Sequence, residues 1–98
     1  MPPTYSFEPS IRADWDRLDA VNKERFRKAR DQLLADLVSG TTPRPGLRVK
    51  GVKGRPGVYE MTWAPDGRAT FEFGAEVKPG NPHILWRRIG THSIFNRP

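Results

Sequence analysis

The chain has 98 residues, 36% of them hydrophobic, and contains no cysteine. This length accommodates one small domain, 1–98, built around one core, and the lack of cysteine excludes disulfides, thiolate catalysis and cysteine-ligated zinc. The net charge of +6 is typical of proteins that bind polyanions, although it also favours solubility by itself. No apolar run approaches the ~20 residues that span a bilayer, and the N-terminus does not have the order of a signal peptide, so we expect a cytoplasmic protein without a membrane partner.

The first half of the chain is expected to form a short strand and two helices. Residues 5–7 alternate aromatic and polar side chains before Pro9, which predicts a short edge strand. Ser10 is a candidate N-cap for a short helix whose apolar stripe consists of Ile11, Trp15 and Leu18. A break near 19–21 leads into a longer helix over 22–38, whose apolar stripe consists of Phe26, Ala29, Leu33, Leu34 and Leu37. We interpret the two helices as an antiparallel hairpin; one kinked helix is the alternative.

The second half has the period of two that strands show. Residues 58–63 and 68–73 are predicted strands, joined by a hairpin turn over 64–67 (Ala-Pro-Asp-Gly) in which Gly67 takes a positive φ. A loop over 75–82 that contains proline and glycine leads to a third strand over 83–89. The predicted fold class is therefore α+β: an N-terminal strand, a two-helix hairpin and a three-stranded antiparallel meander, with the helices packed on one face of the sheet.

A basic run lies between the second helix and the first meander strand. Its four glycine-interleaved cations are Arg48, Lys50, Lys53 and Arg55, and this pattern is suited to close contact with phosphate groups. The alternative is an ordinary solvated loop.

The motifs of several enzyme classes do not occur in the sequence. There is no glycine-rich nucleotide loop and no Gly-x-Ser-x-Gly. The two histidines, His83 and His92, have no carboxylate at metal-ligand spacing, so we expect neither a metal nor a cofactor.

Several side chains of the second half have the chemistry needed to cleave RNA by attack of a 2′-hydroxyl group. This reaction needs proton transfer and cations that stabilise the charge developing on the phosphate. His92 is suited to proton transfer near neutral pH, Arg68 to bidentate phosphate contact, and Phe95 or Trp63 to stacking on a base. In the alternative interpretation, His92 caps a turn and Phe95 fills the core.

Strand alternation predicts which of these side chains share a face. Ala69, Phe71 and Phe73 are expected to pack under the helices, which leaves the face of Arg68 open. On the last strand, Arg87 and Arg88 are expected to point to opposite sides, so only one of them can face such a site.

The order of elements and three segments resemble the RelE/ParE superfamily of bacterial type II toxins. These segments are Val58-Tyr59-Glu60, Arg68-x-x-Phe71 after a Pro-Asp-Gly turn, and Arg88-Ile89-Gly90-Thr91-His92-x-x-Phe95. The closing Gly-Thr-His segment is most similar to the YafQ-like ribosome-dependent mRNA interferases. The resemblance covers residues 5–95.

This resemblance implies a toxin that cleaves mRNA on the ribosome by metal-independent acid-base chemistry and that is held by a cognate antitoxin. It implies that Arg68 binds phosphate and stabilises the transition state, and that His92 acts in acid-base catalysis. It also implies that Asp66, which resembles an aspartate of the YafQ-type turn, is a catalytic residue, and that Phe95 lies next to the cleaved nucleotide. Lys50 and Lys53 match the basic loop, and Arg55, Arg87 and Arg88 are further candidates for substrate binding.

Two other functions fit the same fold. One is ParE-like inhibition of DNA gyrase, and the other is non-catalytic binding of nucleic acid. They stay open because Phe95, unlike the tyrosine frequent at this place in the family, cannot donate a proton.

Overall fold

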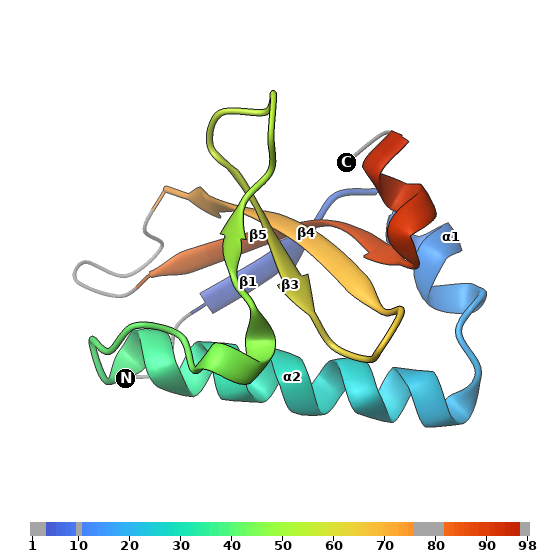
Figure 1. Cartoon of the computed structure of the whole chain (residues 1–98), viewed down its shortest axis with the longest axis horizontal. Helices are drawn as coiled ribbons and strands as arrows, with labels where there is room; N and C mark the ends of the chain where they lie inside the picture. Colours follow the sequence, from blue (N-terminus) through green and yellow to red (C-terminus); the bar gives the residue numbers. More distant parts are fainter. Residues whose placement is uncertain (1–3, 10, 76–81, 97–98) are drawn as a thin grey trace.

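A five-stranded sheet with the order β1-β5-β4-β3-β2 forms the centre of the protein (Figure 1). The computed structural model describes residues 4–9, 11–75 and 82–96. The strands are β1 (Thr4–Phe7), β2 (Lys50–Gly51), β3 (Val58–Thr62), β4 (Arg68–Gly74) and β5 (His83–Gly90). The helices are α1 (Ile11–Asp16) and α2 (Ala20–Val38), with the 3-10 helices η1 (Pro45–Leu47) and η2 (His92–Asn96).

These elements confirm the predicted α+β class. β1 is an edge strand and pairs in parallel with β5, whereas β3, β4 and β5 form the antiparallel meander. The basic run contributes the short strand β2, which the sequence did not predict and which pairs with β3. The N-cap expected at Ser10 and residues 76–81 of the loop after β4 lie outside the described residues.

The break between the two helices has a local cause. Asp19 accepts a hydrogen bond from the backbone N–H of Asn22 at 2.8 Å and so caps α2, which begins at Ala20. Two separate helices, rather than one kinked helix, therefore precede the meander. Within the described ranges, neither has the length and apolar character needed to cross a membrane.

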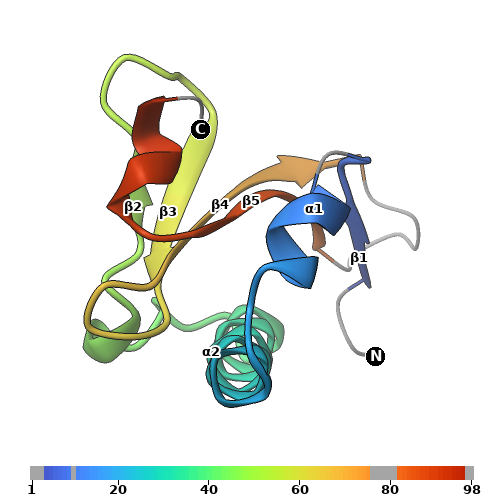
Figure 2. The same ribbon diagram turned by 90° about the vertical axis from the view of Figure 1, so that its right-hand side faces the viewer.

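Phe26 connects α2 to the sheet. Its ring lies edge-on to the rings of Trp86 on β5, at 5.1 Å between centroids, and of Trp63 after β3, at 6.5 Å. Phe26 is 1% exposed, and burying such a ring contributes roughly 2 kcal/mol or more to stability. Ala29 and Leu33 of the predicted stripe are also buried. The apolar stripe of α2 thus forms one layer of the core, and the aromatic face of the meander forms the other. Figure 2 shows α2 on one side of the sheet.

One residue of the predicted aromatic face does not pack under the helices. Phe73 is 50% exposed and lies against the rings of Tyr59 and Phe71, at 5.4 and 5.8 Å. The opposite face is not fully open either, because Thr70 is completely buried there.

A register shift interrupts the alternation of β5. Thr70 pairs with Arg88 but its neighbour Phe71 pairs with Trp86, so Arg87 is an extra residue in the ladder. Trp86 and Ile89 are consequently both buried, although they are three residues apart. The strict alternation predicted for Arg87 and Arg88 is therefore wrong for this strand.

α1 covers the edge that β5 exposes beyond the end of β1. Asp14 of α1 accepts hydrogen bonds from the backbone N–H of Ile89 at 3.1 Å and from Nε and Nη2 of Arg88 at 2.7 and 3.1 Å. The Asp14 side chain is only 4% exposed, so its charge is compensated by these donors rather than by water. The Asp14 carboxylate thus supplies the acceptor that a neighbouring strand would otherwise provide for the N–H of Ile89.

Candidate functional site

The β3–β4 turn positions several of the predicted site residues. Trp63 N–H donates to the carbonyl of Gly67 at 3.1 Å, and Gly67 N–H donates to that of Ala64 at 3.0 Å. Gly67 is not among the described glycines with positive φ, which corrects the predicted reason for a glycine here. A Cβ at this position would instead lie 2.6 Å from the Trp63 ring, so the glycine makes room for the indole. Because Trp63 is itself 9% exposed, it cannot stack on a base as suggested.

Arg68 is anchored to this turn by one of its three nitrogens. Nη1 donates to the carbonyls of Ala64, Pro65 and Gly67 at 3.2, 3.3 and 2.9 Å. Among the described residues, Nε and Nη2 have no acceptor. These two nitrogens form the edge of the guanidinium that binds an oxyanion bidentately. The turn thus holds Arg68 in place while leaving its binding edge available.

η2 brings His92 to the same turn. The helix folds back on β5 because Gly90 leaves room for Ile94, which is 3% exposed; a Cβ at Gly90 would lie 2.8 Å from Ile94 Cγ2. His92 Nδ1 then lies 3.3 Å from Oδ1 of Asp66, a residue 26 positions earlier in the chain. The His92 and Phe95 rings are edge-on, with 5.6 Å between centroids.

This arrangement allows proton transfer at the surface. His92 and Asp66 are 63% and 73% exposed, so a substrate can reach both. When Nδ1–H donates to Asp66, Nε2 is left as an acceptor that can take up a proton, and the carboxylate stabilises the imidazolium that forms. The fold therefore gathers four predicted site residues around one turn: Asp66, Arg68, His92 and Phe95.

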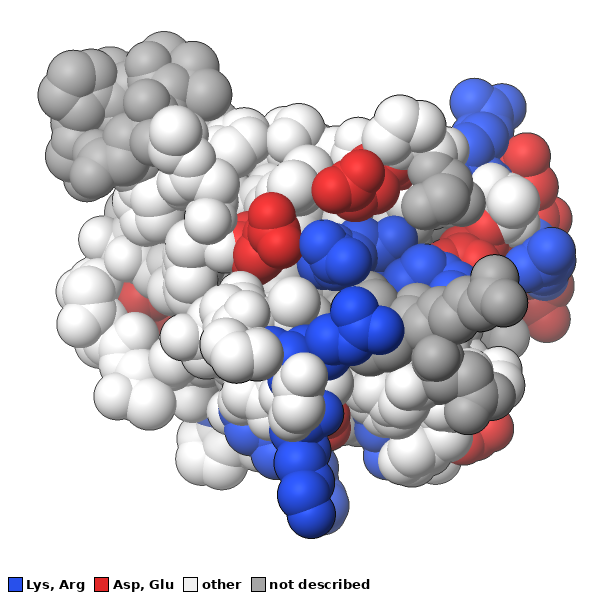
Figure 3. Space-filling view, turned by 90° about the horizontal axis from the view of Figure 1, so that it is seen from above, with Lys and Arg blue, Asp and Glu red and all other residues white. Residues whose placement is uncertain are grey.

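The predicted basic residues lie on the hairpin formed by β2 and β3. Its loop rises on the same side of the sheet as η2, opposite α2 (Figure 2). Lys53 and Arg55 are exposed there, and Lys50 lies 3.7 Å from Glu60. Viewed from above, Lys and Arg side chains gather on part of this face, with carboxylates between them (Figure 3). The loop is thus solvated, as the alternative interpretation had it, and also lies on the face where His92 is found.

Arg87 and Arg88 are both paired with carboxylates. Arg87 Nη1 lies 3.1 Å from Oε2 of Glu72. Asp14 holds the guanidinium of Arg88 at two nitrogens and raises the pKa of Arg88. The role in substrate binding predicted for these two arginines remains a prediction, and their ion pairs give them a structural function.

A basic cleft that the sequence did not predict lies between α2, η1 and the β3–β4 turn. It has a volume of about 650 Å³, and its charged lining residues are Arg25, Lys28, Arg48 and Arg68. Arg25 and Lys28 are three residues apart, which puts them on the same side of α2, next to its buried stripe. This spacing was a weak signal in the sequence of a basic surface along the helix. Only the folded chain shows that Arg48 and Arg68 face the same space.

Comparison with known proteins defines the fold. No family model and no curated protein matches the chain. Solved structures do match: a copper-bound mutant toxin from Helicobacter pylori has 16% identity and a TM-score of 0.66, over 95% of this chain and 97% of that one. The DinJ-YafQ toxin-antitoxin complex of E. coli has 14% identity and a TM-score of 0.62, over 95% and 96%. The archaeal RelE-RelB complex from Pyrococcus horikoshii OT3 has 18% identity and a TM-score of 0.63, over 93% and 96%.

At these identities the similarity concerns the fold. The chain has the α+β fold of small bacterial and archaeal toxins. More specifically, this is the RelE/ParE toxin fold, and the matched structures include YafQ, RelE and YoeB/ParE toxins.

Proposed function

We propose that the protein is the toxin of a type II toxin-antitoxin system and acts as a ribosome-dependent mRNA endoribonuclease. The observation that carries the proposal is the contact of His92 with Asp66 at the turn that anchors Arg68, whose binding edge has no acceptor among the described residues. The fold shared with YafQ and RelE toxins supports it.

The proposed reaction is attack of the RNA 2′-hydroxyl on the adjacent phosphate. Nε2 of His92 takes the hydroxyl proton, O2′ bonds to phosphorus, and the bond to O5′ breaks. The products are a 2′,3′-cyclic phosphate and a 5′-hydroxyl end, with the proton returned to O5′ by the imidazolium or by water. Asp66 stabilises the imidazolium, Arg68 stabilises the charged phosphorane, and Phe95 supports the neighbouring base. All cations in this scheme are side chains, so the scheme uses no metal.

Two partners follow from the proposal. The ribosome supplies much of the positioning of the mRNA, so the isolated protein is expected to be a poor nuclease. An antitoxin protein covers the basic surface and blocks the site. Several of the matched structures, among them the DinJ-YafQ and RelE-RelB complexes, contain a toxin with its antitoxin, which supports the second partner.

Inhibition of DNA gyrase is the second candidate function. A toxin described as YoeB/ParE, from Agrobacterium tumefaciens, matches the chain with 14% identity and a TM-score of 0.58, over 91% of this chain and 98% of that one. Gyrase inhibition acts by protein contact and has no need of the His92–Asp66 pair.

A translation extract supplied with the purified protein distinguishes mRNA cleavage from gyrase inhibition. Codon-periodic cuts in the mRNA support the nuclease, whereas intact mRNA together with a supercoiling defect supports the gyrase inhibitor. His92→Ala and Arg68→Ala should each lower cleavage by about 10²-fold or more. Arg12→Ala is the matched control, because Arg12 is an exposed arginine far in sequence from Arg68 and His92, and this variant should cleave mRNA normally. A folded His92→Ala variant that cleaves mRNA at the normal rate would exclude the acid-base role.

A further inference from the structure

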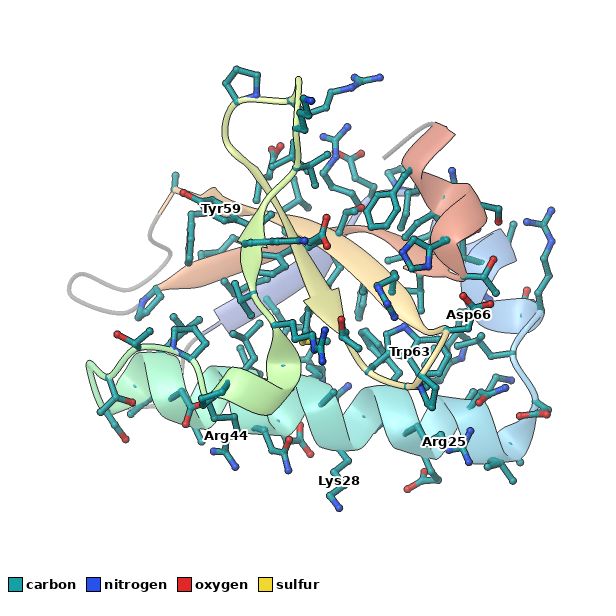
Figure 4. The ribbon with its side chains drawn as sticks, viewed as in Figure 1. Arg25, Lys28, Arg44, Tyr59, Trp63 and Asp66 are labelled. Atoms are coloured by element: carbon teal, nitrogen blue, oxygen red, sulfur yellow. The ribbon has the colours of Figure 1, made fainter. Side chains whose placement is uncertain are left out.

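The basic cleft differs in its charge balance from the rest of the described surface. Its cations come from three elements: Arg25 and Lys28 from α2, Arg48 from the end of η1, and Arg68 from the start of β4. No Asp or Glu is among the described residues that line it. Arg25 and Lys28 lie along α2 below the turn that carries Trp63 and Asp66 (Figure 4).

Most other cations of the described chain are neutralised by a carboxylate. The cations that form an ion pair with a carboxylate are Arg12, Arg17, Arg27, Arg30, Arg44, Lys50, Arg87 and Arg88. The four cleft cations form no ion pair within the described residues; Arg25 donates only to the amide oxygen of Asn22, at 3.3 Å. A neighbouring cavity along α2, which shares Lys28 with the cleft, differs in that Glu24 and Asp31 line it together with its cations. Like charges gathered without counter-charge raise the energy of the free protein and favour an anionic ligand.

The backbone of Arg48 supports the same conclusion independently. It has φ 47° and ψ 45°, and it is the only non-glycine residue with positive φ in the described ranges. This conformation is unfavourable for an arginine, and glycine or asparagine adopts it more readily. A long cation at a place that suits a small residue indicates that the side chain has a function.

We propose that this cleft binds the phosphate backbone of single-stranded RNA, next to the site of cleavage. The proposal rests on the nuclease function proposed above and extends its binding surface. Arg68 belongs both to the β3–β4 turn contacted by His92 and to the lining of the cleft. Arg48 and Arg25 line the same cleft, so they are the cations available to the neighbouring phosphates of an RNA strand that has one phosphate at Arg68. A phosphodiester carries one charge per nucleotide, which suits cations spread along a groove.

The test measures the affinity of a short fluorescein-labelled single-stranded RNA as a function of salt. All variants carry His92→Ala, so that the RNA stays intact. Arg25→Gln and Arg48→Asn should each weaken binding and lower the slope of log K against log salt by about 0.7, the value for one lost phosphate contact. Arg12→Gln removes the same charge at a residue whose side chain is 81% exposed and which does not line the cleft, and it should leave the slope unchanged.

Melting temperatures separate binding from folding. Arg48→Asn should melt at the same temperature as the parent or higher, because asparagine suits this backbone, while its RNA affinity falls. Wild-type affinity and slope in both cleft variants would overturn the proposal. So would variants that bind RNA normally but lose affinity for a polyglutamate peptide, since the cleft would then be a site for an acidic protein segment. Weakened RNA binding in the cleft variants, together with mRNA left uncut by the wild-type protein in the translation extract, would support the cleft while removing the nuclease function.

Discussion

Two carboxylates contact basic side chains near the end of β5, in very different surroundings. Asp14 is 4% exposed and receives three hydrogen bonds, from two nitrogens of Arg88 and the backbone of Ile89. Asp66 is 73% exposed and makes one contact of 3.3 Å with His92. The first pair joins α1 to the sheet, whereas the second joins the β3–β4 turn to η2 at the surface.

The difference shows how burial divides the charged residues of one small protein between structure and chemistry. A buried carboxylate with all its oxygens satisfied cannot bind a substrate, but its loss leaves unpaired donors behind. An exposed pair contributes little to stability, and its atoms remain accessible to a substrate. A carboxylate paired with a basic side chain therefore stabilises the fold at Asp14, whereas at Asp66 it remains accessible for chemistry.

Asp14→Ala should have the largest effect on stability. It removes the Asp14 oxygens that accept from two nitrogens of Arg88 and from the buried N–H of Ile89, so the free energy of unfolding should fall by about 3–5 kcal/mol. Urea denaturation followed by circular dichroism measures this. Asp16→Ala, on the same helix but in an exposed pair with Arg12, should change it by less than about 0.5 kcal/mol. Equal effects of the two substitutions would remove the distinction between buried and exposed pairs.

Gly90→Ala should have the next largest effect. The new methyl group would lie 2.8 Å from Ile94 Cγ2, and relieving that contact displaces η2 at a cost of about 1–3 kcal/mol. Because η2 carries His92, the variant should also lose cleavage activity. Gly51→Ala provides a control, since no atom lies within 4 Å of its added Cβ and Gly51 does not line the basic cleft. Full activity in Gly90→Ala would mean that the position of η2 does not matter to the site.

Asp36 and Arg44 form a pair of intermediate exposure whose effect depends on pH. Hydrogen bonds from the Arg44 side chain, and then from its backbone N–H, lower the pKa of Asp36 from 3.8 to about 2. Because the folded-state pKa is the lower one, this pair stabilises the fold fully above about pH 4, and the contribution is lost as pH falls through about 2. Arg44→Gln should therefore lower the melting temperature at about pH 6 but not at about pH 2. In the Arg44→Gln variant, NMR titration of the Asp36 carboxyl should give a pKa that has risen toward 3.8. A pKa that stays at about 2 would show that the Arg44 side chain does not cause the shift.

His92→Ala should have the smallest effect on stability. The side chain is 63% exposed and contacts only exposed or half-buried groups, so the free energy of unfolding should change by less than about 0.5 kcal/mol. The same urea denaturation as for Asp14→Ala gives the value. A loss of several kcal/mol would instead assign His92 the role of capping the turn, as in the alternative interpretation.

The elements of the fold were predictable because their signals are local. The helical spacing of Phe26, Ala29 and Leu33 predicted α2, and the alternation of residues 58–73 predicted β3 and β4 to within one residue. β2 was not predicted, because a strand of two residues has no periodicity and forms only through its pairing with β3. The error at Arg87 has a similar origin: a shift in pairing arises between strands, and the sequence of one strand does not reveal it.

The candidate site was partly predictable, because Asp66, Arg68, His92 and Phe95 stand out by residue type and by their resemblance to known toxins. By itself the sequence determined the helices, the meander and this set of candidates, since spacing and side-chain chemistry are properties of the linear chain. Only the tertiary structure decided which cations are neutralised and which are not. It placed Arg88 against Asp14 and left Arg25, Arg48 and Arg68 in a cleft without a carboxylate among its described lining residues. The physical reason is that an ion pair depends on distance in space, and residues 74 positions apart in sequence become neighbours only when the chain folds.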